Sequence, residues 1–208
     1  MKILARLGAL AGTPVLALGL AAPAHAGGYT YYDKAGDVTV ETCDATTYEC
    51  TDAVDSSIKE GDAIRSTVQH HAHNVELRTS YRELSGLPEG GALFATVRTN
   101  EKLTRHVIVF HDPEMGSDAF MIRPNGDMVK CGGISTTVSY SRNIIDVKIP
   151  RGCLSRPRWI QAGQGYMWGQ TVEGTTEAPN GSELSYIDDA QTAGLSYDLR
   201  FGPKVFRG

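Results

Sequence analysis

The four cysteines, at positions 43, 50, 131 and 153, constrain the fold of this chain more than any other feature of its sequence. An even number of cysteines in an exported protein is typical of a disulfide framework. The competing interpretation, a four-cysteine zinc site, fits poorly because no two cysteines have the Cys-x-x-Cys spacing. We therefore expect two disulfides, for which three pairings are formally possible.

The sequence around the cysteines favours one of these pairings. Between Cys131 and Cys153, two runs of alternating apolar residues flank a polar turn, and folding the chain about Arg142 places position 131 opposite position 153. The shorter segment between Cys43 and Cys50 also contains a turn, which brings its two ends together. The sequence thus predicts the disulfides Cys131–Cys153 and Cys43–Cys50. The alternating residues of the longer hairpin are Ile134, Thr136, Val138 and Tyr140, then Ile145, Val147 and Ile149.

Export is indicated by residues 1–26, which have the pattern of a secretory signal peptide. Lys2 and Arg6 form a basic start, residues 7–20 are almost wholly apolar or small, and cleavage is expected after Ala26. The apolar run is too short to favour a membrane span. We therefore expect a secreted, extracellular protein with no membrane span.

Most of the remaining chain alternates apolar and polar residues, with turn signals about every ten residues. This pattern indicates an all-β fold, and we expect a single antiparallel β-sandwich stapled by the two disulfides. The expected organisation is an N-terminal extension over residues 27–60, which holds the Cys43–Cys50 hairpin, and a β-sandwich domain over residues 61–208.

Two segments near the end of the chain depart from the strand pattern. Residues 173–185 are rich in Gly, Thr and Glu and are interpreted as an exposed loop. Residues 186–193 are interpreted as a helical turn, with Asp188 and Asp189 at a helix N-terminus or a surface turn.

A cluster of histidines at positions 70, 71 and 73 is the first candidate for a functional site. His71 and His73 are two residues apart, so in an extended backbone both imidazoles would point the same way, as paired zinc ligands must. If Val68 and Val75 flank a hairpin, however, these histidines form its solvated tip. We expect a polar turn and no cofactor, with a His71–His73 metal site as the alternative.

The aromatic pair Tyr166 and Trp168 is the second candidate. Residues two apart in a strand share one face, so both rings would lie on the same side of the sheet. On an exposed face they would form a platform for stacking on a sugar or cell-wall glycan. The alternative is that both rings fill the core, as most large aromatic residues do.

Four segments of the chain carry a family resemblance: GDAIRSTVQHHAHNVELRTSYREL, CGG, DVKIPRGCLSRPRWIQAG and the terminal DDAQTAG…LRFGPKVFRG. They resemble a group of secreted actinobacterial β-sandwich proteins of unknown function. The stretch around Arg151, Cys153 and Trp159 is the most specific. The arrangement is more distantly similar to DOMON and family 9 carbohydrate-binding sandwiches. The resemblance implies export and a sandwich, and it transfers no catalytic residues.

The sequence favours a binding function. The net charge of −4 and the lack of a Lys/Arg cluster argue against a nucleic-acid partner. No G-x-S-x-G motif is present, so a nucleophile elbow is excluded. We therefore expect a non-catalytic extracellular binding module for an envelope glycan, a small ligand or a protein partner. The alternative is a secreted hydrolase with a spatially assembled acid site or a His-metal site.

Overall fold

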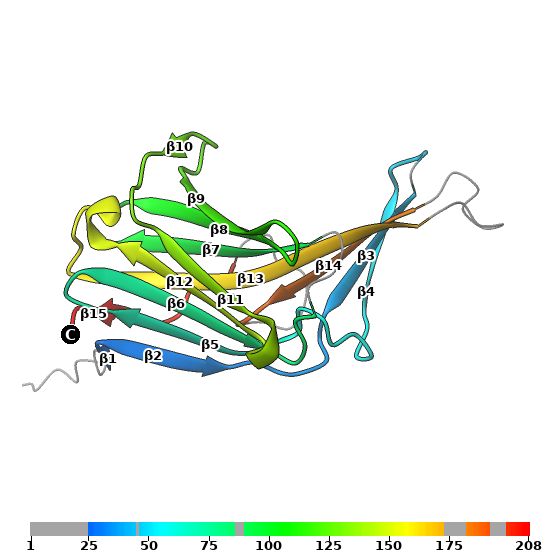
Figure 1. Cartoon of the computed structure of the whole chain (residues 1–208), viewed down its shortest axis with the longest axis horizontal. Coiled ribbons are helices and arrows are strands. Elements are labelled where there is room, and N and C mark those ends of the chain that lie inside the picture. The colour runs from blue at the N-terminus through cyan, green and yellow to red at the C-terminus, as the bar shows by residue number, and fades with distance from the viewer. Residues whose placement is uncertain (1–24, 45, 86–89, 173–181, 192–198) are drawn as a thin grey trace, which may run out of the picture.

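The computed structural model describes residues 25–44, 46–85, 90–172, 182–191 and 199–208, and it confirms an all-β fold (Figure 1). The strands form two antiparallel sheets that pack face to face as a sandwich. The predicted signal peptide lies outside these ranges except for its last two residues. No helix within the described ranges has the length and apolarity needed to cross a lipid bilayer.

The smaller sheet has five strands in the order β11-β12-β6-β5-β2, and each neighbouring pair is antiparallel. Their bounds are β2 Gly28–Tyr32, β5 Ala63–His70, β6 Asn74–Tyr81, β11 Ser135–Ser139 and β12 Ile144–Pro150. Two short 3-10 helices accompany β12, namely η1 Tyr140–Arg142 before it and η2 Arg151–Leu154 after it.

The larger sheet runs β10-β9-β8-β7-β13-β14-β3-β4, with β15 paired to the start of β13 and β1 parallel to β15. Its longer strands are β7 Gly91–Thr99, β8 Thr104–Asp112, β9 Gly116–Ile122, β13 Trp159–Val172 and β14 Ser182–Asp189. The remaining strands are β1 His25–Ala26, β3 Thr39–Asp44, β4 Cys50–Val54, β10 Met128–Val129 and β15 Val205–Phe206.

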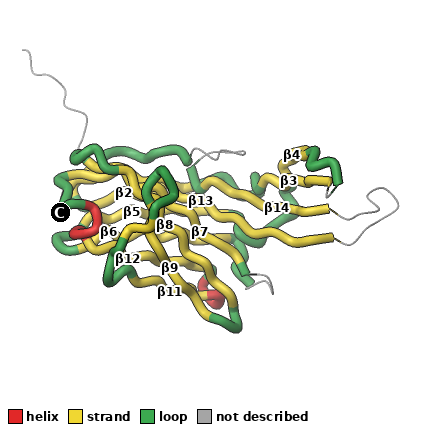
Figure 2. The backbone as a smooth tube through the Cα atoms, turned by 90° about the horizontal axis from the view of Figure 1, so that it is seen from above, coloured by secondary structure: helices red, strands yellow, loops and turns green. Residues whose placement is uncertain are grey.

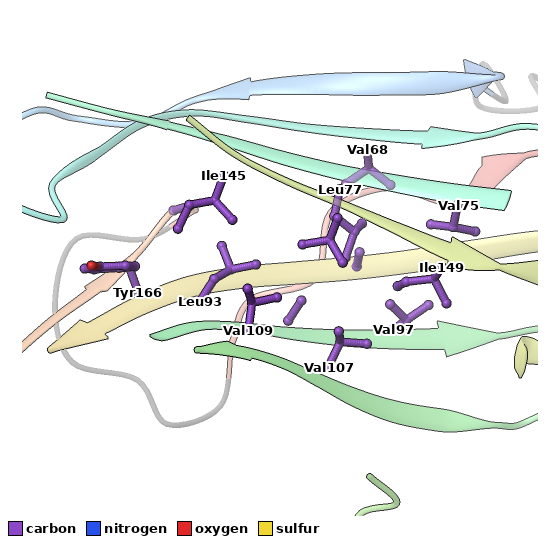
Figure 3. Packing of buried hydrophobic residues seen from close by; sticks show 14 of the residues in the cluster. Val68, Val75, Leu77, Leu93, Val97, Val107, Val109, Ile145, Ile149 and Tyr166 are labelled. Carbon is purple, nitrogen blue, oxygen red and sulfur yellow. The ribbon is translucent and has the colours of Figure 1, made fainter. Parts of the chain in front are cut away.

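The core lies between the two sheets and follows directly from the alternation of apolar residues. Every second residue of a strand points to the same face, so each strand presents one apolar row to the opposite sheet. Figure 3 shows these rows meeting, with side chains from β5, β6 and β12 on one side and from β7, β8 and β13 on the other. The fully buried members include Val68, Val75, Leu77, Leu93, Val97, Val107, Val109, Ile145, Val147, Ile149 and Ile160.

Strand β14 corrects the interpretation of the segment that precedes the C-terminal region. Residues 186–189 continue an extended strand and do not form a helical turn, and residues 182–185 belong to the same strand and not to a loop. β14 pairs with β13 on one side and with β3 on the other. Hydrogen bonding to both neighbours outweighs the weak helix-start signal of Asp188 and Asp189. Residues 173–181 of the predicted loop and residues 192–193 of the predicted helical turn lie outside the described residues.

The strands of residues 27–60 pair with strands of both sheets. β2 pairs with β5, with Tyr29 opposite Val68, and β3 pairs with β14, with Val40 opposite Tyr186. Figures 1 and 2 both place β3 and β4 at the end of the molecule remote from the C-terminus. The loop before β3 therefore connects the smaller sheet to the larger one at this end, and the loop before β5 leads back to the smaller sheet.

Both predicted disulfides are confirmed. Cys43 and Cys50 lie directly opposite each other across β3 and β4, and their sulfurs are bonded. Cys131 lies in the connection from β10 to β11, which passes from the larger sheet to the smaller one, and is bonded to Cys153 in η2. The second disulfide therefore ties the crossover between the sheets to the end of β12.

The hairpin of β11 and β12 is displaced by one residue from the predicted fold about Arg142. Val138 lies opposite Ile145, and Thr136 lies opposite Val147. Directly opposite residues point to the same face of a sheet, so this register keeps the apolar rows of both strands on the core side. Strand pairing ends before either cysteine, and the irregular chain beyond it allows the disulfide to form despite the displacement.

Candidate functional site

The phenylalanines of the chain mark a surface outside the core. None of the five contributes to the buried cluster between the sheets. The inward positions of β7 and β8 are taken by aliphatic residues such as Leu93 and Val109, so the neighbouring Phe94 and Phe110 point to the opposite face. Phe110 is 51% exposed, and its ring centroid lies 5.7 Å from that of Phe120 on β9. The outer face of β7, β8 and β9 therefore carries a cluster of phenylalanines, which is unusual for a solvated face and indicates a binding surface.

The strand registers align the apolar side chains of this outer face in rows. Phe94 lies opposite Ile108, Ile108 lies opposite Phe120, and on its other side Phe94 faces Gly165 of β13. Together these strands form the floor of a groove with a volume of about 790 Å³. Its apolar lining includes Phe94, Ile108, Ile122, Met167, Ile187 and Leu199.

One wall of the groove is the segment 199–201, which lies directly on β13. It can do so because the outward positions beneath it are Gly163 and Gly165. A Cβ atom at Gly165 would lie 2.8 Å from Leu199 Cδ2, and one at Gly163 would lie 2.5 Å from the carbonyl oxygen of Arg200. The alternation of glycines along β13 is therefore the sequence signal for this wall.

Polar side chains also line the groove, among them Thr96, His106 and Arg98. The hydroxyl oxygen of Thr96 lies 2.9 Å from Nδ1 of His106, and both residues line the groove. The guanidinium carbon of Arg98 lies 3.8 Å above the centroid of the Phe201 ring, in a cation–π contact. An exposed guanidinium and an imidazole beside an apolar floor suit a ligand with one polar or anionic end.

A second hollow of about 520 Å³ adjoins the groove on the same face. Met167 lines both, and Phe110 and Trp168 line the second hollow. Met115, which is 87% exposed, also contributes to it. The flexible side chains of Met115 and Met167 suit a binding surface that must adapt to its ligand.

The two aromatic residues singled out from the sequence lie in different surroundings. Tyr166 is only 2% exposed, and Figure 3 shows its ring among core side chains at one end of the cluster. Its ring centroid lies 5.0 Å from that of Tyr81, so it offers no free face for stacking on a ligand. Trp168 is partly buried, stacks on Tyr186 with centroids 3.6 Å apart, and borders the second hollow.

The Tyr166 hydroxyl belongs to a buried polar network that sequence reasoning missed. It lies 2.9 Å from His111 Nε2, and the other imidazole nitrogen lies 3.2 Å from the hydroxyl of Tyr140. Gly91 makes room for this contact, because a Cβ there would lie 2.0 Å from the Tyr166 oxygen. Burial of His111 lowers the pKa of its imidazole to about 4.

This lowered pKa predicts a pH effect on stability. The unfolded state, with a histidine pKa of about 6.5, takes up a proton more readily than the folded state, so the stability contributed by neutral His111 is lost as pH falls from about 6.5 toward 4. We expect the difference in unfolding free energy between the wild type and His111→Gln to shrink by about 2 kcal/mol between pH 7.5 and pH 5. Urea unfolding of both proteins at the two pH values measures it, and a constant difference would contradict the buried neutral imidazole.

The histidine cluster lies at the tip of the β5–β6 hairpin. His71 and His73 are exposed, and His71 Nε2 lies 3.7 Å from a carboxylate oxygen of Glu76. Within the described ranges, no group of three side chains suited to a metal ion includes a histidine.

The third histidine of the cluster, His70, is fully buried at the base of this tip. Its Nε2 accepts a hydrogen bond from Arg151 Nε at 3.1 Å, so Nδ1 carries the proton and donates to the Val205 carbonyl oxygen at 3.2 Å. Arg151 also donates to the carbonyl oxygens of Ala72 and Pro157. His70 therefore fastens the tip to η2 and β15.

Fold and site together define an all-β sandwich with a ligand-sized groove on the outer face of its larger sheet. No protein-family model matches the chain, and the search of curated proteins finds no match either. The function must therefore be inferred from the geometry of the groove itself.

Proposed function

We propose that this protein is a secreted, non-catalytic binding module that holds a small, largely apolar ligand in the groove on its outer face. The observation that carries the proposal is the groove of about 790 Å³, lined mainly by apolar side chains with a few polar groups at its margin. Small-molecule sites have this composition and volumes of roughly 300–1,000 Å³. The two disulfides support an oxidising compartment, as the predicted export requires.

A small apolar ligand fits the groove better than an envelope glycan does. A glycan presents many hydroxyl groups, and burying them without hydrogen-bond partners is costly. The floor formed by Phe94, Ile108 and Met167 offers no hydrogen-bonding side chains. Arg98 and His106 lie where they can bind the polar end of an amphipathic molecule.

The carboxylates beside the groove do not favour the alternative of a hydrolase. Among the described residues that line it, the acids are Asp188 and Asp189, and both are buried. Asp189 accepts hydrogen bonds from the backbone N–H groups of Gln191 and Arg200, so it holds the groove wall in place. Asp188 points to the opposite face of β14, where its Oδ2 accepts from the backbone of Ala63. Neither is placed to exchange protons with a ligand in the groove.

The proposal is tested by placing a charge on the groove floor. We expect the wild type to bind the apolar fluorophore N-phenyl-1-naphthylamine, and palmitate to displace it. Ile108→Lys should weaken fluorophore binding at least about tenfold, because the ammonium group would lie against apolar surface. Ile144→Lys is the matched control, since Ile144 is also half-buried and lies on the outer face of the smaller sheet.

Two outcomes would contradict the proposal. One is equal loss of fluorophore binding in Ile108→Lys and Ile144→Lys, which would place the binding elsewhere. The other is saturable retention on insoluble cell-wall peptidoglycan that Ile108→Lys abolishes, with no fluorophore binding by the wild type. That result would assign the same face to a glycan.

A further inference from the structure

Three aspartates from distant parts of the chain meet at the end of the sandwich where β3 and β14 pair. Asp37 precedes β3, Asp62 precedes β5, and Asp188 lies in β14. One carboxylate oxygen of each lies within 4.8 Å of one oxygen of each of the others. The three residues are 2%, 0% and 3% exposed, so the carboxylates have been withdrawn from water. Ionised carboxylates in such a place are strongly destabilising unless they are paired or bind a cation.

The protein orients two of these carboxylates through one oxygen each. Asp62 Oδ2 accepts hydrogen bonds from the backbone N–H of Gly36 at 2.8 Å and from Arg82 Nη1 at 2.7 Å. Asp188 Oδ2 accepts one from the backbone N–H of Ala63 at 2.5 Å. Both carboxylates are thus fixed through their Oδ2 atoms, as the ligands of a metal ion are fixed by their surroundings.

The other oxygens of the cluster have no such partners. Asp62 Oδ1, Asp188 Oδ1 and both oxygens of Asp37 make no hydrogen bond with any described residue, although all four are buried. Most buried polar atoms in folded proteins are hydrogen-bonded, so four unpaired oxygens in one cluster call for a ligand. Arg82 pairs with Asp62, and the charge of Lys34 acts on Asp37, so positive groups also lie near the three carboxylates.

We infer that Asp37, Asp62 and Asp188 form a binding site for a calcium ion. The potential ligands are all carboxylate oxygens, which suit a hard cation and disfavour zinc or copper, whose sites use nitrogen or sulfur ligands. Asp37, with both oxygens unpaired, can bind through one or both of them. Calcium accepts such variable geometry, whereas magnesium requires near-ideal octahedral coordination and retains several waters.

The position of the site indicates what the ion would do. Asp62 leads into β5 of the smaller sheet, whereas Asp37 and Asp188 flank or belong to strands of the larger sheet. A bound ion would therefore link the two sheets at the end of the sandwich where β3 and β14 pair. It would stabilise the folded state because the three ligands come together only after folding.

Protons are the competing way to neutralise the cluster. Burial, and then the charges of Asp33, Asp37 and Asp62, raise the pKa of Asp188 to about 8. Burial likewise raises the pKa of Asp33 to about 7. A carboxyl whose pKa is raised by folding favours the folded state at low pH, and this advantage is lost as pH rises toward 8. Calcium requires deprotonated carboxylates as ligands, so calcium and protons compete for this cluster.

The test uses the full secreted chain, treated with EDTA and then titrated with CaCl₂ at pH 8. We expect calorimetry to show one site per chain, and Tm to rise by about 5 °C or more at a hundredfold excess over Kd. Asp37→Asn should abolish this binding, while Asp118→Asn, at an exposed position of β9, should leave it unchanged. MgCl₂ should bind at least about tenfold more weakly.

Asp37→Asn keeps the shape of the side chain and removes one negative charge from a repelling cluster. The variant should therefore be at least as stable as the wild type in EDTA, which separates loss of binding from loss of folding. The inference is overturned if the wild type shows no saturable calcium binding up to millimolar concentrations, which would mean that protons alone neutralise the cluster. Unchanged binding by Asp37→Asn, or equal binding of magnesium, would also overturn it.

Discussion

Replacing Tyr166 with alanine is expected to lower the free energy of unfolding by about 4 kcal/mol, as large-to-small substitutions of buried aromatic residues do. The ring is 2% exposed and packs against Tyr81 and His111. Truncation would leave a cavity beside both rings and would remove the hydroxyl that pairs with His111. Urea unfolding monitored by circular dichroism measures the loss.

Tyr166→Phe separates packing from hydrogen bonding in this prediction. The phenylalanine ring fills the same space, so only the hydroxyl is lost and one imidazole nitrogen of His111 is left unpaired. We expect a cost of about 1–2 kcal/mol. An alanine variant with unchanged stability and abolished ligand binding would contradict the buried position and restore the stacking platform that the sequence suggested.

The all-β fold and both disulfides could be predicted from the sequence because they depend on local alternation. The same alternation of apolar residues also determines the register of the β11–β12 hairpin, which differs by one residue from the predicted one. Val138 and Ile145 must point to the same face, as directly opposite residues do, whereas a shift of one residue would place them on opposite faces. Centring the turn on Arg142 pairs Val138 with the polar Asp146. The apolar pattern therefore specifies the observed register.

Strand β14 could not be predicted in the same way because its pairing is not local in sequence. Its residues mix Ser, Glu and Asp with Tyr and Ile, so the alternation is weak over Ser182–Asp189. The strand is fixed by β13 and β3, which hydrogen-bond to its two edges. Tertiary pairing thus overrides a weak local preference.

The groove and the aspartate cluster both needed the three-dimensional structure. The sequence places Phe94 and Phe110 next to core residues, and only the sheet order shows that they share one outer face with Met167. Asp62 and Asp188 are 126 positions apart in the numbering, and no sequence spacing predicts their contact. The sequence does contain one signal for the groove, namely Gly163 and Gly165, which alternate along β13 beneath the groove wall.

The last two residues of β14 belong to the aspartate cluster and to the surroundings of the groove, respectively. Adjacent residues of a strand point to opposite faces, so Asp188 faces the buried cluster while Asp189 faces the groove side. Asp189 holds the backbone of Arg200, which is part of the groove wall. Substitutions designed to test ligand binding should therefore be placed on β8, as Ile108→Lys is, because changes at this end of β14 would disturb both sites.

Removing the Cys131–Cys153 disulfide is expected to lower the free energy of unfolding by about 3 kcal/mol in the chain-entropy treatment of cross-links. The cysteines are 22 positions apart, and the bond restrains the crossover between the two sheets. Both half-cystines also pack against the core, so alanine at both positions forfeits some apolar contact as well. Urea unfolding of Cys131→Ala/Cys153→Ala, with thiol titration to confirm that the other disulfide is intact, measures this loss.

The matched comparison is Cys43→Ala/Cys50→Ala. These cysteines are 7 positions apart and join adjacent strands at the remote end of the larger sheet, and Cys50 is exposed. The shorter loop constrains the unfolded chain less, and the β3–β4 end can open without exposing the core, so we expect a loss of at most about 2 kcal/mol. A larger loss from this variant than from Cys131→Ala/Cys153→Ala would mean that the β3–β4 end holds the sandwich together. In that case the disulfide at the β3–β4 end would contribute more to the free energy of unfolding than the disulfide at the crossover between the sheets.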